Sequence, residues 1–380
     1  MKVALVSRGW FPSIRGGSEK FITRLALELF KMGFEVIGIT RWLLGFERPQ
    51  ARHKLIVMKE ESPRPLLASL RFSRWASRVV NDLRPDVVIV NSYWGEASPL
   101  FISKSIPVIA LIHDVGLFRS ELAMRSRLKY FLRSFVLKRV VSRANAVVVP
   151  TESVKRDVIK YLNADASKIY VLGVEGVEGP FRRVHEDNEW FDVVQVGRFA
   201  PNKGQSILLE AFKRFVKEVP NARLWLVGGR GVDPKHIKYL EGIRSMSREI
   251  NRDLGREVVK VVIDAPNVDT YYRLADVCVA PSIAEEGYGL TVVECMAYGK
   301  PVIASDIFLE TGVANEERAY IFPRGDISEL VNKLLHVYRN YDEALRKADE
   351  GLRFAKQCSW EEVARRVVKI INDVTKVRPD

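Results

Sequence analysis

A repeated alternation of short apolar runs with amphipathic segments of helical period constrains the fold most strongly. The first half of the chain contains six apolar runs of strand length: Val3–Ser7, Val36–Thr40, Leu55–Met58, Val87–Asn91, Pro107–Ile112 and Ala146–Val149. The alternation restarts further on, with runs at Phe191–Gly197, Arg223–Val227, Val258–Ile263, Val277–Pro281 and Pro301–Ala304. Strands that alternate with helices favour parallel sheets covered by helices on both faces, so we predict an α/β fold.

The length of the chain and the break between the two series predict two domains. The 380 residues, of which 47% are hydrophobic, exceed what one compact core accommodates. The segment Gly173–Glu189 has no apolar period, which indicates a linker. We predict Rossmann-like domains over residues 1–180 and 181–360. Residues 361–380 are predicted to form a terminal helix, because apolar residues from Trp360 to Val374 recur on one face.

The cysteines and the N-terminal residues indicate the cellular compartment of the protein. Three cysteines without metal-ligand spacing argue against a disulfide framework and are typical of a reducing compartment. Cys278 and Cys295 lie in apolar runs, where we expect them to be buried small hydrophobic side chains. The chain begins with a strand pattern rather than a signal peptide, and no apolar stretch approaches the ~20 residues that span a bilayer. We therefore expect a cytoplasmic protein, soluble or peripheral on a membrane.

Positive charge is concentrated in the first half of the chain. The net charge is +13, and residues 1–185 contain 31 Lys and Arg against 16 Asp and Glu. Two stretches, Arg64–Arg84 and Arg119–Arg143, combine basic residues with apolar ones at helical spacing. Such basic amphipathic segments favour an anionic partner for this half of the chain, either a membrane surface or a nucleic acid.

Two glutamates lie between the last two apolar runs. Glu286 falls in a loop with glycines on either side of Tyr288, and Glu294 falls in the helix-like segment that follows. Ligands of parallel sheets bind beyond the carboxyl ends of the strands, so this loop is a candidate ligand site. Its glycines allow close backbone approach, and the start of the helix offers N–H groups to an anion such as phosphate. Without that context, two glutamates at this spacing would be surface charges.

Two cations follow the first strand of the second series. Gly197 and Arg198 end this strand, and Lys203 and Gly204 open the helical segment Gln205–Glu218. Fixed cations at such a place can stabilise the negative charge that develops on a departing diphosphate.

Both stretches resemble signatures of the retaining glycosyltransferases of family 4, which have the GT-B fold. The similarity covers Glu-x7-Glu with its Gly-aromatic-Gly, and Gly-Arg-x4-Lys-Gly. It implies two Rossmann-like domains facing each other across a deep cleft, with the terminal helix crossing back to the first domain. The first domain would bind the acceptor and the second the nucleotide-sugar. Because no Asp-x-Asp signature of metal-dependent transferases is visible, we expect no essential divalent metal or other cofactor.

The resemblance also implies roles for single residues. Arg198 and Lys203 would bind the donor diphosphate, Glu286 the donor sugar, and Glu294 the ribose hydroxyls. Glu285 lacks the family spacing to Glu294. Backbone N–H groups would be offered to sugar or phosphate by Gly289, Leu290 and Thr291.

Two elements of the first domain complete the predicted site. Gly16 and Gly17 follow the first strand, where they would approach the donor phosphate and the acceptor, or form a plain turn. His113 follows the run Pro107–Ile112 and would hydrogen-bond the donor sugar near its 6-hydroxyl, although a lone histidine is often structural.

The predicted catalytic residues are Glu286, His113, Arg198 and Lys203. We name no general base, because attack on the face of the departing phosphate is favoured for this family.

The chain departs from the family pattern at two places. The linker lacks the usual Asn, and bulky residues replace glycines at Ile307–Glu310, so contacts known for those positions are not transferred. The role of Glu310 is left open.

Together these features predict retaining transfer of a hexose to a lipid-linked or membrane glycolipid acceptor. The first choice of donor is GDP-mannose, by analogy with membrane-associated relatives that have basic acceptor domains. UDP-glucose or another UDP-hexose is the alternative. The acceptor side is predicted to dock on an anionic membrane, at the cytoplasmic face. The rivals are a GT-B epimerase or phosphorylase, a non-catalytic scaffold and a nucleic-acid-binding protein, and the two signatures argue against them.

Overall fold

The computed structural model describes residues 1–12, 17–43, 47–60, 65–91, 97–113, 127–173, 176–184, 186, 188–230, 234–284, 286 and 288–376. Its contacts divide the chain into two compact units, one of Met1–Gly176 with Trp360–Asp380 and one of Val177–Ser359. The chain therefore passes between the units twice, at Gly176–Val177 and at Ser359–Trp360. The boundaries predicted at residues 180 and 360 lie next to these two crossings.

The first unit is built on a parallel sheet of seven strands in the order β3-β2-β1-β4-β5-β6-β7. Six strands correspond to the predicted runs: β1 (Lys2–Val6), β2 (Glu35–Leu43), β3 (Lys54–Glu60), β4 (Val87–Asn91), β5 (Val108–Leu111) and β6 (Ala146–Val149). The seventh, β7 (Ile169–Val171), has only three residues and lies at the edge, where half-buried side chains give a weak apolar pattern.

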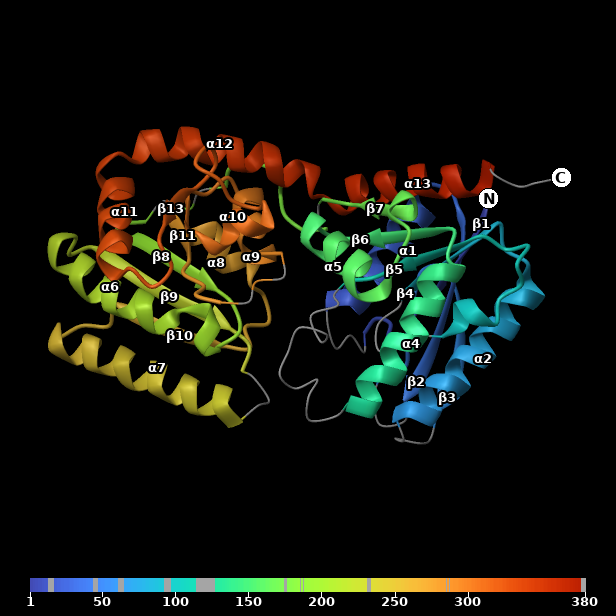
Figure 1. The fold of residues 1–380 in the computed structure, drawn as a ribbon. Helices are drawn as coiled ribbons and strands as arrows, with labels where there is room; N and C mark the ends of the chain where they lie inside the picture. Colours follow the sequence, from blue (N-terminus) through green and yellow to red (C-terminus); the bar gives the residue numbers. More distant parts are fainter. Residues whose placement is uncertain are drawn as a thin grey trace. The chain divides into compact units, whose positions relative to one another are not determined.

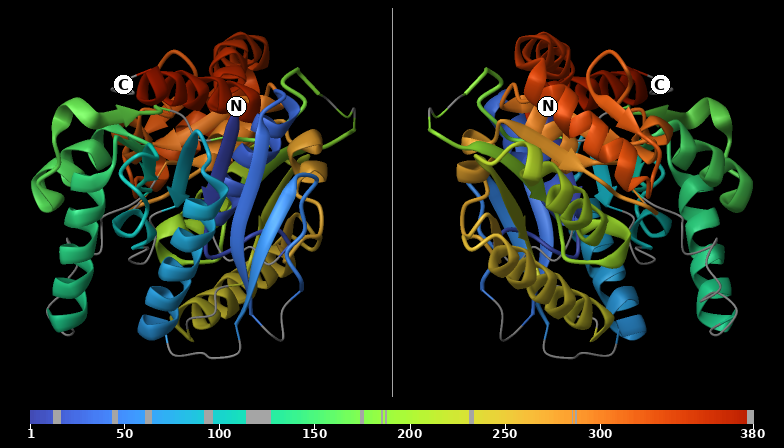
Figure 2. Two further views of the ribbon diagram at one scale, coloured as in Figure 1. Left: turned by 90° about the vertical axis from the view of Figure 1, so that its right-hand side faces the viewer. Right: turned by 90° about the vertical axis from the view of Figure 1, so that its left-hand side faces the viewer.

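Helices cover both faces of this sheet. One face is covered by α2 (Pro65–Leu83), α4 (Arg127–Arg143) and α5 (Glu152–Leu162), which share a core with the strands. The left view of Figure 2 shows α2 and α4 on the same side of the blue strands. The other face carries α1 (Gly17–Lys31), which packs against α13 (Trp360–Lys376). Two short 3-10 helices, η1 (Ser98–Leu100) and η3 (Ala166–Lys168), join these elements.

The second unit contains a parallel sheet of six strands in the order β10-β9-β8-β11-β12-β13 (Figure 1). Its strands are β8 (Phe191–Val196), β9 (Ala222–Gly228), β10 (Val259–Ile263), β11 (Val277–Ala280), β12 (Val302–Ser305) and β13 (Tyr320–Phe322). All but the short β13 were predicted. The predicted α/β fold with two parallel sheets is therefore confirmed.

The helices of the second unit also lie on two faces (Figure 1). One face carries α6 (Gln205–Glu218), α7 (Pro234–Asp253) and α11 (Ile327–Arg339), which bury Val277 and Val279 of β11. The opposite face carries α8 (Asp269–Leu274) and α9 (Leu290–Ala297), and α12 (Tyr341–Gln357) packs on α9. The remaining short elements are η4 (Pro201–Lys203) and α10 (Ile307–Thr311).

A disulfide joins Cys278 of β11 to Cys295 of α9. The prediction that these cysteines are buried is confirmed, but the expectation that they are not disulfide-bonded was wrong. Side chains alternate along a strand, so Cys278 points away from the face that Val277 and Val279 bury and toward α9. Cys358 is buried and is not disulfide-bonded.

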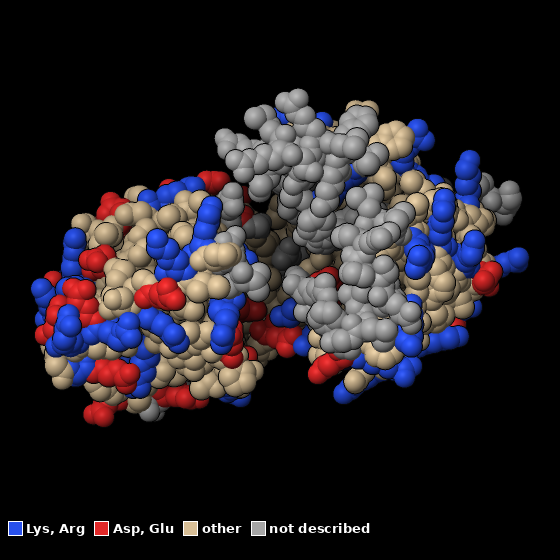
Figure 3. Space-filling model, turned by 90° about the horizontal axis from the view of Figure 1, so that it is seen from below, with Lys and Arg blue, Asp and Glu red and all other residues tan. Residues whose placement is uncertain are grey.

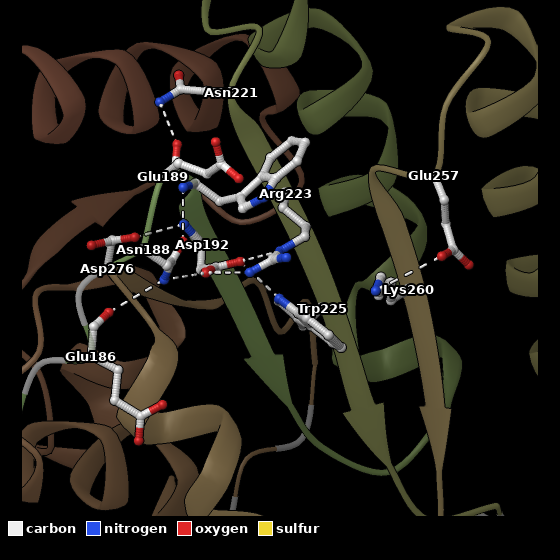
Figure 4. A network of polar contacts seen from close by, with 11 residues as sticks. Glu186, Asn188, Glu189, Asp192, Asn221, Arg223, Trp225, Glu257, Lys260 and Asp276 are labelled. Atoms are coloured by element: carbon white, nitrogen blue, oxygen red, sulfur yellow. Dashed lines mark hydrogen bonds and ion pairs between the residues drawn. The ribbon is translucent and has the colours of Figure 1, made fainter.

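A buried polar network closes the amino edge of the second sheet (Figure 4). Asp192 at the start of β8 is fully buried and accepts hydrogen bonds from Arg223 Nε at 2.7 Å and Trp225 Nε1 at 2.8 Å. The Asn188 amide also donates to Asp192, at 3.2 Å. The Asp192 backbone N–H donates to Asp276 at 2.7 Å. The network thus connects the segment before β8 with β8, β9 and the residue that precedes β11.

Among the helices that the structure describes, none is both long enough and apolar enough to cross a bilayer.

Candidate functional site

The predicted donor-site residues of the second unit gather where its strand order reverses. The chain runs outward from β8 to β9 and β10, then returns to β11 on the other side of β8. Ligands of open parallel sheets bind at this topological switch point, beyond the carboxyl ends of the strands. Arg198 follows the end of β8, and Glu286 lies in the loop that follows β11.

Lys203 and Glu286 form an ion pair at this point. The Lys203 Nζ lies 2.7 Å from the Glu286 Oε1, and their side chains are 25% and 6% exposed. The Ser282 hydroxyl donates to the same carboxylate oxygen. Ser282 is in turn held by the Ser305 hydroxyl, which donates to its carbonyl oxygen at 2.6 Å. The two signatures, 83 residues apart in sequence, are thus brought into direct contact.

Arg198 lies on the same edge with an exposed side chain. It makes no ion pair with any residue that the structure describes. Its carbonyl oxygen accepts a hydrogen bond from the Gln205 amide at 3.1 Å, which fixes the backbone rather than the guanidinium. The guanidinium therefore remains available to an anionic ligand.

Two glycines permit the close packing of this site. Gly204 has a φ of +68°, and a Cβ there would lie 2.0 Å from the Pro281 carbonyl oxygen. Gly289 has a φ of +102°, and a Cβ there would lie 2.8 Å from the Phe308 ring. Only glycine adopts such conformations without strain. Gly289 precedes α9, whose first backbone N–H groups, from Leu290 and Thr291, have no acceptor inside the helix.

Glu294 lies in the middle of α9 and is partly buried. Its Oε2 accepts a hydrogen bond of 2.9 Å from the hydroxyl of Tyr272 in α8. Burial and the negative charge of Glu294 hold the pKa of Tyr272 well above its ordinary value, so this hydroxyl stays protonated and remains a donor. Sequence reasoning missed Tyr272, because no signature surrounds it.

The remaining predicted site residues belong to the first unit. Gly16 lies outside the described residues, and Gly17 begins α1. His113 follows β5 with its ring edge against Phe21, 5.2 Å between centroids. Its Nε2 has no hydrogen-bond partner among the residues that the structure describes. Burial lowers the pKa of His113 to about 4, so its imidazole is neutral at neutral pH.

A further polar side chain at this edge was not predicted. Asn91 ends β4, the strand at the switch point of the first sheet, and is buried. Its amide donates to the Ser7 hydroxyl at 3.3 Å and to the Ser18 carbonyl oxygen at 3.1 Å, while its Oδ1 has no partner within the described part of the chain. Its place at a strand end was the one available signal.

The structure also shows the ion-pair partner of Glu310 and how possible metal ligands are distributed. Glu310 forms an ion pair with Arg324 at 2.6 Å, so its charge is used within the unit. Within the described ranges, no group of three or more His, Cys, Asp or Glu residues could hold a metal ion.

Each half of the chain matches a model of a known protein family. Residues 15–173 match the family model described as "Glycosyltransferase Family 4". Residues 191–340 match the model described as "Glycosyl transferases group 1". The ion pair between Lys203 and Glu286 lies in the second matched region.

Individual proteins agree with these matches. A phosphatidyl-myo-inositol mannosyltransferase of Mycobacterium leprae is 30% identical over 184 residues, which are 48% of this chain and 46% of that relative. An alpha-monoglucosyldiacylglycerol synthase of Acholeplasma laidlawii is 25% identical, over 90% of this chain and 89% of that protein.

Solved structures show the same fold. The structure of a sucrose-phosphate synthase from Thermosynechococcus elongatus matches with a TM-score of 0.76 and 21% identity, over 99% of this chain and 100% of that one. The chain therefore belongs to the retaining glycosyltransferases of family 4 and group 1, and it has the GT-B fold.

Proposed function

We propose that the protein transfers a hexose, with retention of configuration, from a nucleotide-sugar to a lipid-linked or membrane glycolipid acceptor. The observation that carries this proposal is the contact of Lys203 with Glu286 at the switch point of the second sheet. A cation for a diphosphate and a carboxylate for sugar hydroxyls lie side by side there. A sugar nucleotide presents these two groups on either side of the bond to be broken.

The proposed reaction breaks the bond between the anomeric carbon and the diphosphate oxygen. Arg198, Lys203 and the start of α9 stabilise the negative charge that develops on the diphosphate. Glu286 accepts hydrogen bonds from the sugar. The acceptor hydroxyl attacks on the face from which the phosphate departs, and its proton passes to the leaving phosphate oxygen. In this scheme the two cations supply the charge that a divalent metal would otherwise provide, so we propose that full activity persists in EDTA.

The ion pair also sets the order of events at Lys203. In the structure its Nζ is bound to Glu286, so a donor phosphate must share or replace this contact. Binding of the phosphate would then leave Glu286 free to accept from the sugar. His113, with its neutral ring, is retained as a proposed hydrogen-bonding group for the sugar.

For the donor we propose GDP-mannose, with a UDP-hexose as the alternative. The mycobacterial relative is named as a mannosyltransferase, and the acholeplasmal relative is named as an enzyme of glucosyl transfer. Both names refer to lipid acceptors, which supports the proposed acceptor class.

The membrane part of the proposal is supported by a mixed basic and apolar surface on the first unit. Leu70 of α2, Phe101 beside η1 and Phe135 of α4 are 39%, 39% and 50% exposed. Arginines lie over two of these rings, Arg74 at 5.6 Å from Phe101 and Arg139 at 4.9 Å from Phe135. Figure 3 shows basic and acidic side chains interspersed over the second unit, but mainly basic ones on the described surface of the first. Basic residues beside exposed aromatic rings fit an anionic lipid surface.

A panel of nucleotides tests the donor. Thermal unfolding is measured with GDP, UDP and ADP and with their sugars, since a ligand of the folded state raises the apparent stability. The nucleotide-sugar that binds is then incubated with lipid acceptors, and NMR identifies the anomeric configuration of the product. Failure of every nucleotide to raise the melting temperature, or inversion of configuration, contradicts the proposal.

Vesicle sedimentation tests the membrane surface. We expect binding to anionic vesicles at low salt and none to neutral ones, with Phe135→Ala reducing the bound fraction. The matched control is Ile237→Ala, which removes a 47% exposed side chain from the second unit. Equal binding to both kinds of vesicle, or equal loss in both variants, contradicts the membrane proposal, and binding to nucleic acid instead favours the rival.

A further inference from the structure

We propose that Tyr272 is a positioning residue for the nucleotide: its hydroxyl holds the Glu294 carboxylate in the orientation that accepts the ribose hydroxyls. This inference rests on the proposed function, in which Glu294 binds the ribose. It adds a residue that neither signature contains and that lies 22 positions before Glu294 in sequence.

The geometry of the contact supports a fixed orientation. The Tyr272 hydroxyl donates to Glu294 Oε2 at 2.9 Å, within the usual range for such a bond. The Tyr272 ring is itself immobilised, since it is 3% exposed and lies 5.4 Å from the Tyr298 ring at an angle of 31°. A glutamate side chain has three rotatable bonds, so a hydrogen bond to a rigid partner restricts the orientation of its carboxylate.

The backbone next to Glu294 is also fixed. Cys295, the neighbour of Glu294, is bonded to Cys278 of β11. The backbone that carries Glu294 is thus attached to the sheet, and its carboxylate is attached to α8. Two independent links therefore define where the acceptor oxygens lie.

The chemistry of this carboxylate suits a ribose. An ionised carboxylate has about four acceptor sites, and Tyr272 occupies one on Oε2. A ribose presents its 2′- and 3′-hydroxyls as adjacent donors, which match the two oxygens of one carboxylate. The raised pKa of Tyr272 keeps its hydroxyl protonated, so it remains a donor to Oε2 across the physiological pH range.

A plain structural explanation makes a different prediction. A buried tyrosine hydroxyl needs a hydrogen-bond partner, and Glu294 would then only satisfy Tyr272. In that case removal of the hydroxyl would alter folding stability without distinguishing a ribonucleotide from a deoxyribonucleotide.

The test compares nucleotide binding by the full-length protein and its Tyr272→Phe variant, which keeps the packed ring. Calorimetry gives the Kd for whichever of GDP, UDP and ADP binds most tightly, and for its 2′-deoxy form. We expect Tyr272→Phe to weaken the ribonucleotide about five- to ten-fold and the deoxynucleotide less than about two-fold, as for loss of one hydrogen bond that orients a charged acceptor. On a Glu294→Gln background, the same substitution should have little effect on either ligand.

Tyr298→Phe is the matched control. Tyr298 is equally buried and stacks on Tyr272, but its hydroxyl is hydrogen-bonded to Asp269. We expect it to leave the ratio between the two nucleotides unchanged. Equal weakening of both nucleotides in Tyr272→Phe, or no weakening of either, overturns the proposal. If the unmodified protein itself binds both forms equally, the ribose role of Glu294 fails, which is a failure of the proposed function and separable from that of Tyr272.

Discussion

The ion pair between Lys203 and Glu286 should have two separable roles, one in stability and one in turnover. Lys203→Met removes the cation but keeps the length and the apolar part of the side chain. The Glu286 side chain is 6% exposed, so its charge would be left with the Ser282 hydroxyl as the remaining side-chain donor among the described residues. Breaking a buried pair costs about 3–5 kcal/mol, and partial exposure of Lys203 reduces this to about 2 kcal/mol.

The same substitution should slow donor cleavage by more than the stability change implies. Loss of one preorganised group that stabilises developing charge lowers kcat about 10²- to 10³-fold. Urea unfolding gives the first quantity, and release of nucleoside diphosphate from the donor gives the second. Lys203→Met/Glu286→Gln removes both charges, so we expect it to recover stability to within about 1 kcal/mol of the unmodified protein but not to recover turnover.

Lys213→Met controls for the general loss of a lysine. Lys213 is 38% exposed and pairs with Asp253 at 3.2 Å, so its removal should change stability by less than about 0.5 kcal/mol. The reasoning is refuted if Lys203→Met behaves as Lys213→Met does, or if the double variant regains stability and turnover together.

Three further results are expected. Asp192→Asn should destabilise the protein by about 2–4 kcal/mol in urea unfolding, because the half-buried Arg223 and Trp225 donors lose their fully buried, charged acceptor, and a change below about 0.5 kcal/mol would contradict this. Burial lowers the pKa of His53 to about 4, so the unfolded chain binds the extra proton first as pH falls below about 6.5. His53→Leu should therefore reduce the stability lost between pH 7 and 5.5 by about 1 kcal/mol, and identical pH profiles would count against it. Mild reduction of the Cys278 disulfide should weaken nucleotide binding, measured by calorimetry before and after reoxidation, and an unchanged Kd would show that the link is not needed to position α9.

Much of the fold followed from local periodicity. Apolar runs such as Val87–Asn91 became strands with the predicted bounds, since burial on both faces makes every residue of a central parallel strand apolar. The three-residue edge strands β7 and β13 were missed, because so short a run carries no measurable period.

The site was predicted in its parts rather than in its connections. Sequence placed Lys203 at the start of a helical segment and Glu286 in a loop, but their contact depends on β8 and β11 being neighbours, which follows from the strand order. The disulfide was missed for a related reason. Cys278 and Cys295 belong to different elements, and their pairing requires that α9 cover the face of β11 that carries Cys278. Tyr272 lies in a six-residue helix without any signature, so only the folded geometry connects it with Glu294.

Hydrogen–deuterium exchange with and without the bound nucleoside diphosphate tests the placement of the donor site most directly. We expect protection in two stretches that are distant in sequence, residues 196–206 and residues 281–296, which meet through Lys203 and Glu286. No protection in either stretch, or protection confined to residues outside both, would contradict the assignment of the nucleotide-sugar to the switch point of the second sheet.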